Sequence, residues 1–411
     1  MRVSNCCELN LITHACAIIK DEESSLIFDP WFSGTAFNNG WRLSQEIDPS
    51  SLNLSSIKHV YISHEHPDHF HIPTLKRINN NWDPIFLIQK SYDRRMAKFI
   101  KNILKKRVKE LNNSESYKIS KAISLRIYSH GHMDSFALIK AGSNTILNIN
   151  DCVLKNKNSL FGLKNRLFQK SIDVLMSQYS FASFQGNEEE KNSLIRAGDQ
   201  HLDWIKQRID FFKPKVFIPF ASGIIWCAKE NKYLNNYSVD YNRVIEAIQD
   251  CSNKPLILNK DKEVNIIELE SIKITSYKEN SYNQKNQAQA FETNEEISKT
   301  EIINQIYEAL DFAKSKLNEE NFGVITKLMF LLGKFGILRT ILLELNFENH
   351  SKHYFEFLPG LQLIYLTEGK KKLSKAQQSQ ITMASDSFKY CLQNQFGAET
   401  LWVNSRFKII N

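Results

Sequence analysis

The chain has 411 residues, of which 42% are hydrophobic and 24% charged, and its formal net charge is +8 at pH 7. This composition is that of a globular protein with room for one large domain and a smaller one, and it excludes a chain that is disordered overall. The mild basicity favours a small anionic substrate, and nothing in the pattern of basic residues predicts a specific nucleic-acid site.

Seven scattered cysteines form no C-x-x-C pair, so we expect neither a disulfide framework nor a zinc ribbon, and we predict a reducing, cytoplasmic location. The N-terminal run 9–19 is partly apolar, but Asn10, Thr13 and His14 interrupt it, which favours β-strands over a signal peptide. The later apolar region 324–345 contains three basic residues, which argue against a membrane span.

In the first two thirds of the chain, short apolar runs bounded by polar breaks predict a series of strands. These strands are Leu9–Ile12, Ala15–Ile19, Ser25–Phe28, His59–Ser63, Ile85–Ile88, Leu125–Tyr128, Ser135–Lys140, Thr145–Ile149, Asp173–Met176 and Lys215–Pro219. Apolar residues at helical spacing predict helices over Ile72–Ile78, Arg94–Leu111 and about Asn192–Phe212. The second of these helices is rich in Lys and Arg, and we interpret it as a solvated helix rather than a phosphate-docking surface. Strands that alternate with helices predict an α/β fold.

A loop rich in aromatic residues follows the third predicted strand. Trp31, Phe37 and Trp41 stand in it, and they could either line the mouth of a pocket or belong to the core.

The segment His64-Glu65-His66-Pro67-Asp68-His69 directly follows the predicted strand His59–Ser63. A turn at the end of a buried strand can point several side chains at one centre, and imidazoles with carboxylates are metal ligands. The alternative is a surface turn that happens to be rich in histidine, but this spacing arises by chance about once in a million start positions. The segment therefore predicts a metal site.

Further ligand candidates stand at the ends of two other predicted strands. His130 and His132 follow one strand, and Asp151 follows the next. Residues i and i+2 of an extended segment point to opposite faces, so only one of the two histidines can reach the same centre as the first cluster.

The last part of the chain is predicted to be a separate unit. The segment Ser281–Glu295 is rich in Asn and Gln and is interpreted as a linker between a domain over 1–280 and a C-terminal unit over 296–411. Helices are predicted over about Glu296–Leu317 and Phe322–Leu345, with apolar stripes that would pack against the first domain. No cluster of catalytic residues stands there, so we expect an auxiliary role.

The H-x-H-x-D-H pattern of His64, His66, Asp68 and His69 resembles the signature of the metallo-β-lactamase superfamily. The resemblance spans roughly residues 1–270, and it implies an αββα sandwich with the site at one edge, here with a mainly helical C-terminal extension. It also implies that His130 is the third ligand of the first metal and that Asp151 bridges two metals.

Flanking segments are similar to the catalytic part of CMP-N-acetylneuraminate hydroxylases and their bacterial relatives. The segments that carry this likeness include His14-Ala15-Cys16-Ala17, Phe28-Asp29-Pro30-Trp31, Asp151-Cys152 and Pro219-Phe220-Ala221.

The sequence departs from these relatives in two ways. The hydroxylases carry a Rieske domain, which needs C-x-H and C-x-x-H pairs, and this sequence has neither, so no Rieske cluster is expected. The superfamily commonly adds a late histidine to its second metal site, yet none follows the strand that ends at Pro219. Asp68, His69 and Asp151 then offer only three ligands, and we expect the second cation to bind more weakly than the first.

Hydrolysis is the first prediction for the reaction. One or two divalent ions, zinc before iron or manganese, would activate a water, with Asp68 and Asp151 as the catalytic carboxylates that orient the water or hold the second cation. The substrate would be an anionic phosphoester, lactone or amide of a sugar or nucleotide sugar.

Two alternatives remain open at this point. A non-haem iron oxygenase acting on a nucleotide sugar would fit the same ligand types, and it would need a separate reductase. A non-catalytic metal-binding scaffold is the other alternative.

Overall fold

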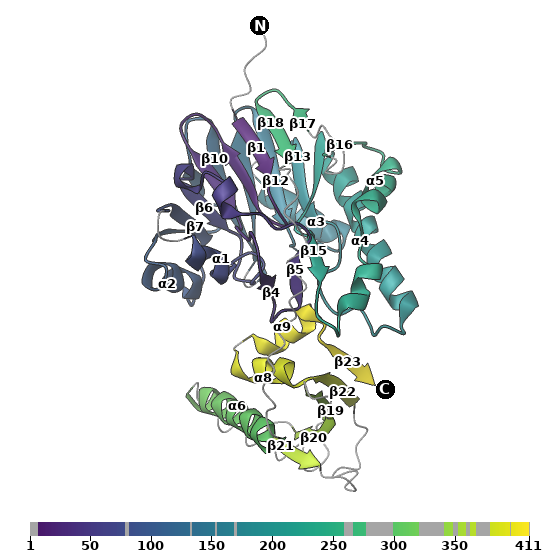
Figure 1. The fold of residues 1–411 in the computed structure, drawn as a ribbon. Helices are drawn as coiled ribbons and strands as arrows, with labels where there is room; N and C mark the ends of the chain where they lie inside the picture. Colours follow the sequence, from purple (N-terminus) through teal and green to yellow (C-terminus); the bar gives the residue numbers. More distant parts are fainter. Residues whose placement is uncertain are drawn as a thin grey trace.

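The computed structural model describes residues 7–78, 82–131, 134–152, 154–167, 171–258, 266–276, 299–319, 341–347, 352–358, 362–366, 379–394 and 396–410 (Figure 1). His132 and the predicted linker Ser281–Glu295 lie outside these residues, as does most of the helix predicted over Phe322–Leu345. The domain boundaries at 280 and 296 therefore stay predictions.

Two large sheets face one another in the first part of the chain (Figure 1). The first has the strand order β17 (Ile266–Glu268), β18 (Ile272–Ser276), β1 (Cys7–Leu11), β2 (Ala17–Lys20), β3 (Ser25–Phe28), β6 (His59–Ile62), β7 (Ile85–Gln89) and β8 (Arg107–Leu111). The second has the order β16 (Leu256–Ile257), β14 (Val216–Phe220), β13 (Val174–Gln178), β12 (Asn144–Asn150), β11 (Asp134–Ala141), β10 (Ile123–His130) and β9 (Ser116–Lys118). A small third sheet joins β15 (Ile224–Trp226), β5 (Trp41–Leu43) and β4 (Thr35–Ala36).

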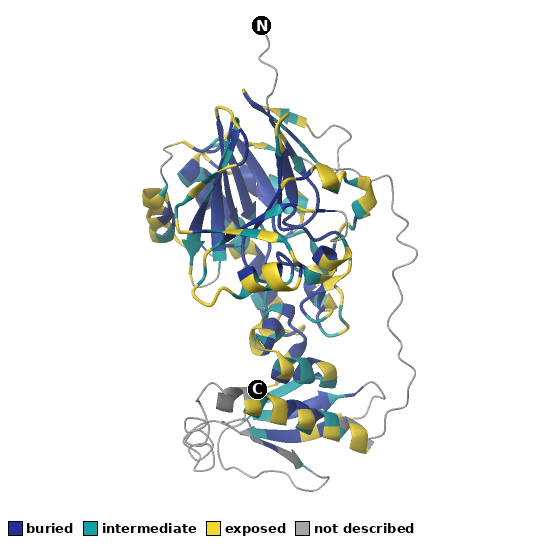
Figure 2. Ribbon diagram, turned by 90° about the vertical axis from the view of Figure 1, so that its left-hand side faces the viewer, coloured by how far each residue is buried: buried dark blue, intermediate teal, exposed yellow. Residues whose placement is uncertain are grey.

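Helices cover the outer faces of both large sheets (Figures 1 and 2). α1 (Ile72–Arg77) and α2 (Arg95–Asn102) lie on the first sheet, and α3 (Lys157–Arg166), α4 (Lys191–Phe212) and α5 (Tyr241–Gln249) lie on the second. Short 3-10 helices span Pro49–Ser51, Leu54–Ser56 and Lys232–Asn236.

Alternation along the strands separates the three layers of the core. On β6, Tyr61 points into the apolar core between the two sheets, whereas Val60 and Ile62 point to the core under α1 and α2. On β12, Ile146 likewise faces the space between the sheets and Leu147 faces the helices of the second sheet. The architecture is therefore the αββα sandwich that the sequence predicts.

The helix predicted over Arg94–Leu111 is wrong in its second half. α2 ends at Asn102, and Arg107–Leu111 forms β8, which pairs in parallel with β7. The segment alternates, with Arg107 and Lys109 exposed and Leu111 buried, and a two-residue period is that of an edge strand. Arg107 and Lys109 of the basic run thus lie on the edge of a sheet rather than on a helix.

The C-terminal unit contains the helices α6 (Lys299–Glu319), α8 (Ser385–Gln393) and α9 (Gly397–Asn404), together with a sheet that the sequence analysis did not predict. The sheet has the order β21 (Gln362–Leu366), β20 (Lys352–Leu358), β19 (Ile341–Asn346), β22 (Ser379–Ala384) and β23 (Phe407–Ile410). The helix predicted to continue to Leu345 is wrong from Ile341 onward, because β19 pairs with both β20 and β22. This pairing buries Leu343 and Leu345 in a core of their own.

α9 and the chain that follows it attach this unit to the sandwich, as Figure 1 shows. The Asn404 side-chain amide donates to the Phe37 carbonyl at 3.0 Å, and the Asn231 amide donates to the Asn404 carbonyl at 2.7 Å. Arg406 donates to the Asn38 carbonyl at 2.8 Å and lies 3.4 Å from the Glu230 carboxylate.

Among the helices that the structure describes, none combines the length and the apolar character needed to cross a membrane. None of the described cysteines is joined in a disulfide.

Candidate metal centre

Four segments place imidazoles and carboxylates at one end of the sandwich. The turn after β6 carries His64 to His69, the β1–β2 turn carries His14, the β10–β11 hairpin carries Asp134, and the end of β12 carries Asp151. Three groups of side chains in the described residues have possible ligand atoms within 4.8 Å of one another. These groups are His64, His66 and Asp134; His14, Asp68 and His69; and His64, His69 and Asp151.

The first group lies at the outer part of the site. His64 Nε2 is 2.8 Å from His66 Nδ1, so two imidazole nitrogens face a common point. Asp134, the first residue of β11, adds a carboxylate to them. His64 is buried, whereas His66 and Asp134 are partly exposed.

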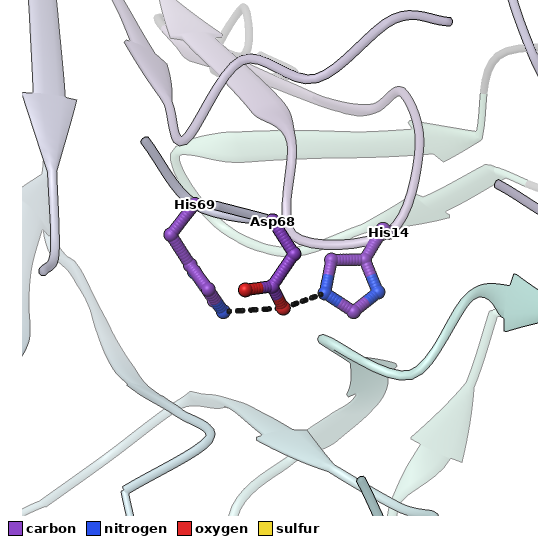
Figure 3. Close-up of side chains that lie close together, drawn as sticks. All are labelled: His14, Asp68 and His69. Carbon is purple, nitrogen blue, oxygen red and sulfur yellow. Dashed lines mark hydrogen bonds and ion pairs between the residues drawn. The ribbon is translucent and has the colours of Figure 1, made fainter. Parts of the chain in front are cut away.

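The second group is fully buried (Figure 3). The Asp68 carboxylate stands between two imidazoles, with Oδ2 3.0 Å from His14 Nε2 and 3.3 Å from His69 Nε2. His14 comes from a turn 54 residues earlier in the chain than Asp68.

Asp151 connects the two groups. Its Oδ2 lies 3.5 Å from His64 Nε2 and 3.5 Å from His69 Nε2. A single carboxylate oxygen is thus close to one imidazole of each group, which is the arrangement that the resemblance implies for a bridging ligand.

Asp29 fixes the orientation of His69 from behind. It follows β3 in a left-handed backbone conformation, with φ of 34°, and its carboxylate accepts hydrogen bonds from the Ser63 N–H at 2.8 Å and the Asn150 amide at 2.8 Å. The same carboxylate lies 2.8 Å from His69 Nδ1, which leaves Nε2 to face the centre. A carboxylate behind an imidazole in this way sets the tautomer and the basicity of a metal ligand.

Burial and neighbouring charge shift the pKa values of His64 and His69 in opposite directions. Burial lowers the pKa of His64 to about 4, so the ring is neutral at pH 7. Burial alone would also lower the pKa of His69, but three nearby carboxylates raise it well above its ordinary value. Burial opposes ionisation of Asp68 and Asp151, yet the adjacent imidazoles hold the pKa of both carboxyls below the usual range.

The residues present fit a metal centre. Asp68 Oδ1 and Asp151 Oδ1 are buried and make no hydrogen bond to any described residue, and His69 Nε2 makes none either. Buried polar atoms in proteins nearly always have a partner, so three such atoms on neighbouring members of these groups suit a site for cations. Nitrogen and carboxylate donors together suit zinc, iron and manganese.

The structure brings together five of the six predicted metal ligands, namely His64, His66, Asp68, His69 and Asp151. His130 ends β10 directly opposite Asp134, but it belongs to none of the three groups, and His132 lies outside the described residues. The role of His130 as a ligand stays a prediction.

Sequence reasoning missed His14 and Asp134 as candidate ligands, and it missed Asp29 as the group that orients His69. His14 and Asp29 do stand in segments that carry the likeness to the hydroxylases, which was the only available signal. The second site was expected to bind its cation weakly because only three candidate ligands were counted, and His14 is a fourth candidate.

A pocket of about 150 Å³ opens beside His66 and is lined from both parts of the chain. Phe37, Glu65, His66 and Pro67 come from the sandwich, and Tyr390, Asn394, Phe396, Glu399 and Thr400 come from the C-terminal unit. The Glu399 carboxylate lies 3.8 Å from His66 Nε2. Of the three loop aromatics, Trp31 and Trp41 are core residues, and Phe37 is buried and also lines this pocket.

Residues 8–155 match a family model described as "Beta-lactamase superfamily domain". Curated relatives include the cytidine monophosphate-N-acetylneuraminic acid hydroxylase of Danio rerio, 26% identical over 244 residues, which cover 55% of this chain and 40% of the relative. The hydroxylase of the same name from Asterias rubens is 28% identical over 251 residues, which cover 56% of this chain and 36% of the relative. The chain thus spans less than half the length of these relatives.

Among solved structures, CmlA, a diiron beta-hydroxylase from Streptomyces venezuelae, is similar at 16% identity and a TM-score of 0.42, over 60% of this chain and 52% of that chain. The segment matched by the family model contains every residue of the three groups described above. Residues 8–155 thus match a β-lactamase superfamily domain, and over about half of its length the chain is similar to CMP-N-acetylneuraminate hydroxylases.

Proposed function

We propose that this chain is a binuclear non-haem iron enzyme that hydroxylates a small molecule with O₂. The observation that carries the proposal is the composition of the first two groups. His64 and His66 stand with Asp134, and His14 and His69 stand with Asp68. Two imidazoles and one carboxylate with open positions are the ligand set of non-haem iron oxygenases.

This proposal reverses the order of the two reactions expected from the sequence. Hydrolysis came slightly ahead there because the sequence lacks the ligands of a Rieske cluster that would donate electrons to an oxygenase. The grouping of Asp134 with His64 and His66 supports a set with more carboxylate oxygen, which suits iron.

The relatives support the same class of reaction. The proteins that are 26–28% identical over just over half of this chain are named hydroxylases of a cytidine monophosphate sugar. For this chain we propose a nucleotide sugar or a related anionic sugar as substrate.

Bound iron would supply the reduction of O₂, in which substrate C–H, O₂, two electrons and two protons give C–OH and water. The electrons would come from a separate reductase. The chain's own residues perform the remaining tasks: Asp29 holds His69 toward the centre, and buried carboxylate oxygens of Asp68 and Asp151 neutralise the positive charge there. The pocket beside His66 offers aromatic side chains, and carboxylates that can accept hydrogen bonds from sugar hydroxyls, to orient the substrate next to the centre.

Hydrolysis is the second candidate. The free Oδ1 atoms of Asp68 and Asp151 favour it, because a buried carboxylate oxygen without a hydrogen bond could accept a proton from an attacking water.

The test separates the two reactions by the origin of the oxygen in the product. Apoprotein loaded with Fe²⁺ or with Zn²⁺ would be incubated with CMP-N-acetylneuraminate as the first probe, a chemical reductant and ¹⁸O₂. We expect one ¹⁸O atom in the product of the iron form, and no turnover without oxygen. Turnover of the zinc form under strict anaerobiosis would contradict the proposal and support hydrolysis. The variant His59→Gln controls for the loss of a histidine outside the centre and should react as the wild type does. His59 is buried and lies at the opposite end of β6.

A further inference from the structure

His14 is a buried histidine whose ring lacks the partners that other buried histidines of this chain have. Its Nε2 lies 3.0 Å from Asp68 Oδ2, and its Nδ1 is buried without a hydrogen bond to any described residue. In His71, which is equally buried, Nδ1 lies 2.8 Å from Thr74 Oγ1 and Nε2 lies 3.1 Å from the Thr35 carbonyl. Both ring nitrogens of His71 therefore have a hydrogen-bond partner, whereas only one ring nitrogen of His14 has one.

The carboxylate that contacts the His14 ring, that of Asp68, belongs to the second group of the centre. His14 and His69 approach the same Asp68 oxygen from two sides, with ring centroids 5.6 Å apart and planes inclined by 66° (Figure 3). Two imidazole nitrogens that converge on one buried carboxylate leave a space bounded by two nitrogens and one oxygen. This arrangement is the donor set of a cation rather than of an apolar core.

Residues that come much later in the chain contact the His14 turn and hold it in this place. The Ala221 N–H, directly after β14, donates to the His14 carbonyl at 2.9 Å. The Thr13 hydroxyl donates to the Trp31 carbonyl at 2.8 Å, which fixes the other side of the turn. Gly223 lies so close that a Cβ there would be 3.2 Å from His14 Cα.

We propose that His14 is a protein ligand of the second metal site, which then consists of His14, Asp68 and His69 with Asp151 shared between the sites. This inference rests on the proposed metal-dependent function, and it adds that the chain recruits the donor from its N-terminal β1–β2 turn. The rival role is that of a positioning residue, in which His14 only orients Asp68 by a hydrogen bond.

The first experiment counts metal ions. The full-length apoprotein would be titrated with Zn²⁺ in competition with a chromophoric chelator. We expect two equivalents for the wild type. In His14→Ala, one equivalent should keep its affinity, and the second should weaken by more than about 100-fold, which exceeds the 10- to 100-fold loss typical of an outer-shell partner. The control His59→Gln should bind two equivalents, and circular dichroism would confirm that each variant is folded.

A second measurement distinguishes a ligand from a positioning residue. In the Co²⁺-loaded protein, each coordinated imidazole gives a strongly shifted exchangeable N–H signal in the proton NMR spectrum. We expect signals from His14, His64, His66 and His69, and the loss of one of them in His14→Gln.

Two results would overturn the inference while leaving the proposed function intact. One is a His14→Ala variant that binds two ions with wild-type affinity, and the other is a His14→Gln variant that keeps every shifted signal. A wild-type protein that binds no second ion would overturn both the inference and the proposed binuclear function.

Discussion

At the scale of single residues, Asp29 is the group on which the orientation of the centre depends. It contacts Ser63, His69 and Asn150, and all four side chains are buried. Asp29→Ala should lower the affinity of the second metal by about 10- to 100-fold, because His69 loses the carboxylate that fixes its tautomer. Metal titration of the apoprotein measures this effect, with the exposed Asp48→Ala as control. Unchanged affinity in Asp29→Ala would show that His69 is held by other contacts.

Asp134 and His130 are rival ligands for the first metal. They face each other across the β10–β11 hairpin, but only Asp134 lies within ligand distance of His64 and His66. Elemental analysis should therefore find one metal ion lost in Asp134→Ala and in His66→Ala, and metal content near wild type in His130→Ala. The opposite result, with metal lost only from His130→Ala among the hairpin variants, would restore the ligand set that the superfamily resemblance implies.

His201 gives the fold a pH dependence that is independent of the metal centre. Burial in α4 lowers its pKa from the ordinary 6.5 to about 4, although its Nδ1 lies 2.9 Å from the Ala197 carbonyl. Below pH 6.5 the unfolded chain takes up the proton first, so this contribution to stability is complete above pH 6.5 and is lost as the pH falls toward 4. With allowance for partial exposure of the ring, we expect about 1–2 kcal/mol.

Urea unfolding at pH 7 and pH 5 measures this difference. His201→Gln should lose about 1–2 kcal/mol less than the wild type between the two pH values. Equal losses in both proteins would show that the His201 ring protonates in the folded state at an ordinary pH.

At the scale of elements, the connection between β14 and β15 supports the β1–β2 turn. A Cβ on Gly223 would lie 3.2 Å from His14 Cα, so Gly223→Ala must displace the His14 backbone by a few tenths of an ångström. We expect a loss of about 1–3 kcal/mol in the free energy of unfolding, as in other overpacked sites, together with weaker binding of the second metal.

Gly162→Ala is the matched control. Gly162 lies in α3 with open space around it, so a methyl group there should be neutral or stabilise the helix by up to about 1 kcal/mol. A Gly223→Ala protein as stable as Gly162→Ala would show that the β1–β2 turn can move without loss of free energy of unfolding.

The elements that the sequence predicts well are those whose pattern is local. β3 and β6 read as short apolar runs with clear breaks, and the H-x-H-x-D-H segment is contiguous, so each could be found within a few residues. β8 was missed because its five alternating residues directly follow a segment with helical spacing. β19 was missed because its apolar residues continue the helical spacing of the segment before it. His14 and Asp134 reach the centre only through the order of strands in the two sheets, which no local pattern encodes.

At the scale of the whole molecule, the C-terminal unit forms part of the pocket beside the centre. Five of the nine residues that line the pocket come from that unit, although none of these five belongs to a metal-binding group. A chain truncated before residue 299 should keep its metal ions but be less soluble, because the surface under α9, including Phe37, loses its cover. It should also bind substrate much more weakly.

Metal content, size-exclusion chromatography and KM measure these three outcomes separately. Glu399→Gln in the full chain is the milder companion variant, since it replaces a carboxylate that can accept from sugar hydroxyls by a neutral amide and should raise KM without loss of metal. Loss of metal from a folded truncated chain would contradict the auxiliary role predicted for residues 296–411.

The centre takes its side chains from both sheets, and this has a consequence for how the protein is made. His14 and the His64–His69 turn belong to the first sheet, whereas Asp134 and Asp151 belong to the second. Cations held at the two sites would link the two sheets at one edge, and each cation at 100 times its Kd would stabilise the native state by about 2.7 kcal/mol. Because the donors are spread from residue 14 to residue 151, the metal sites are complete only after both sheets have formed and packed together. We therefore expect metal binding to be a late step of folding, in which the sandwich forms first and takes up its ions afterwards.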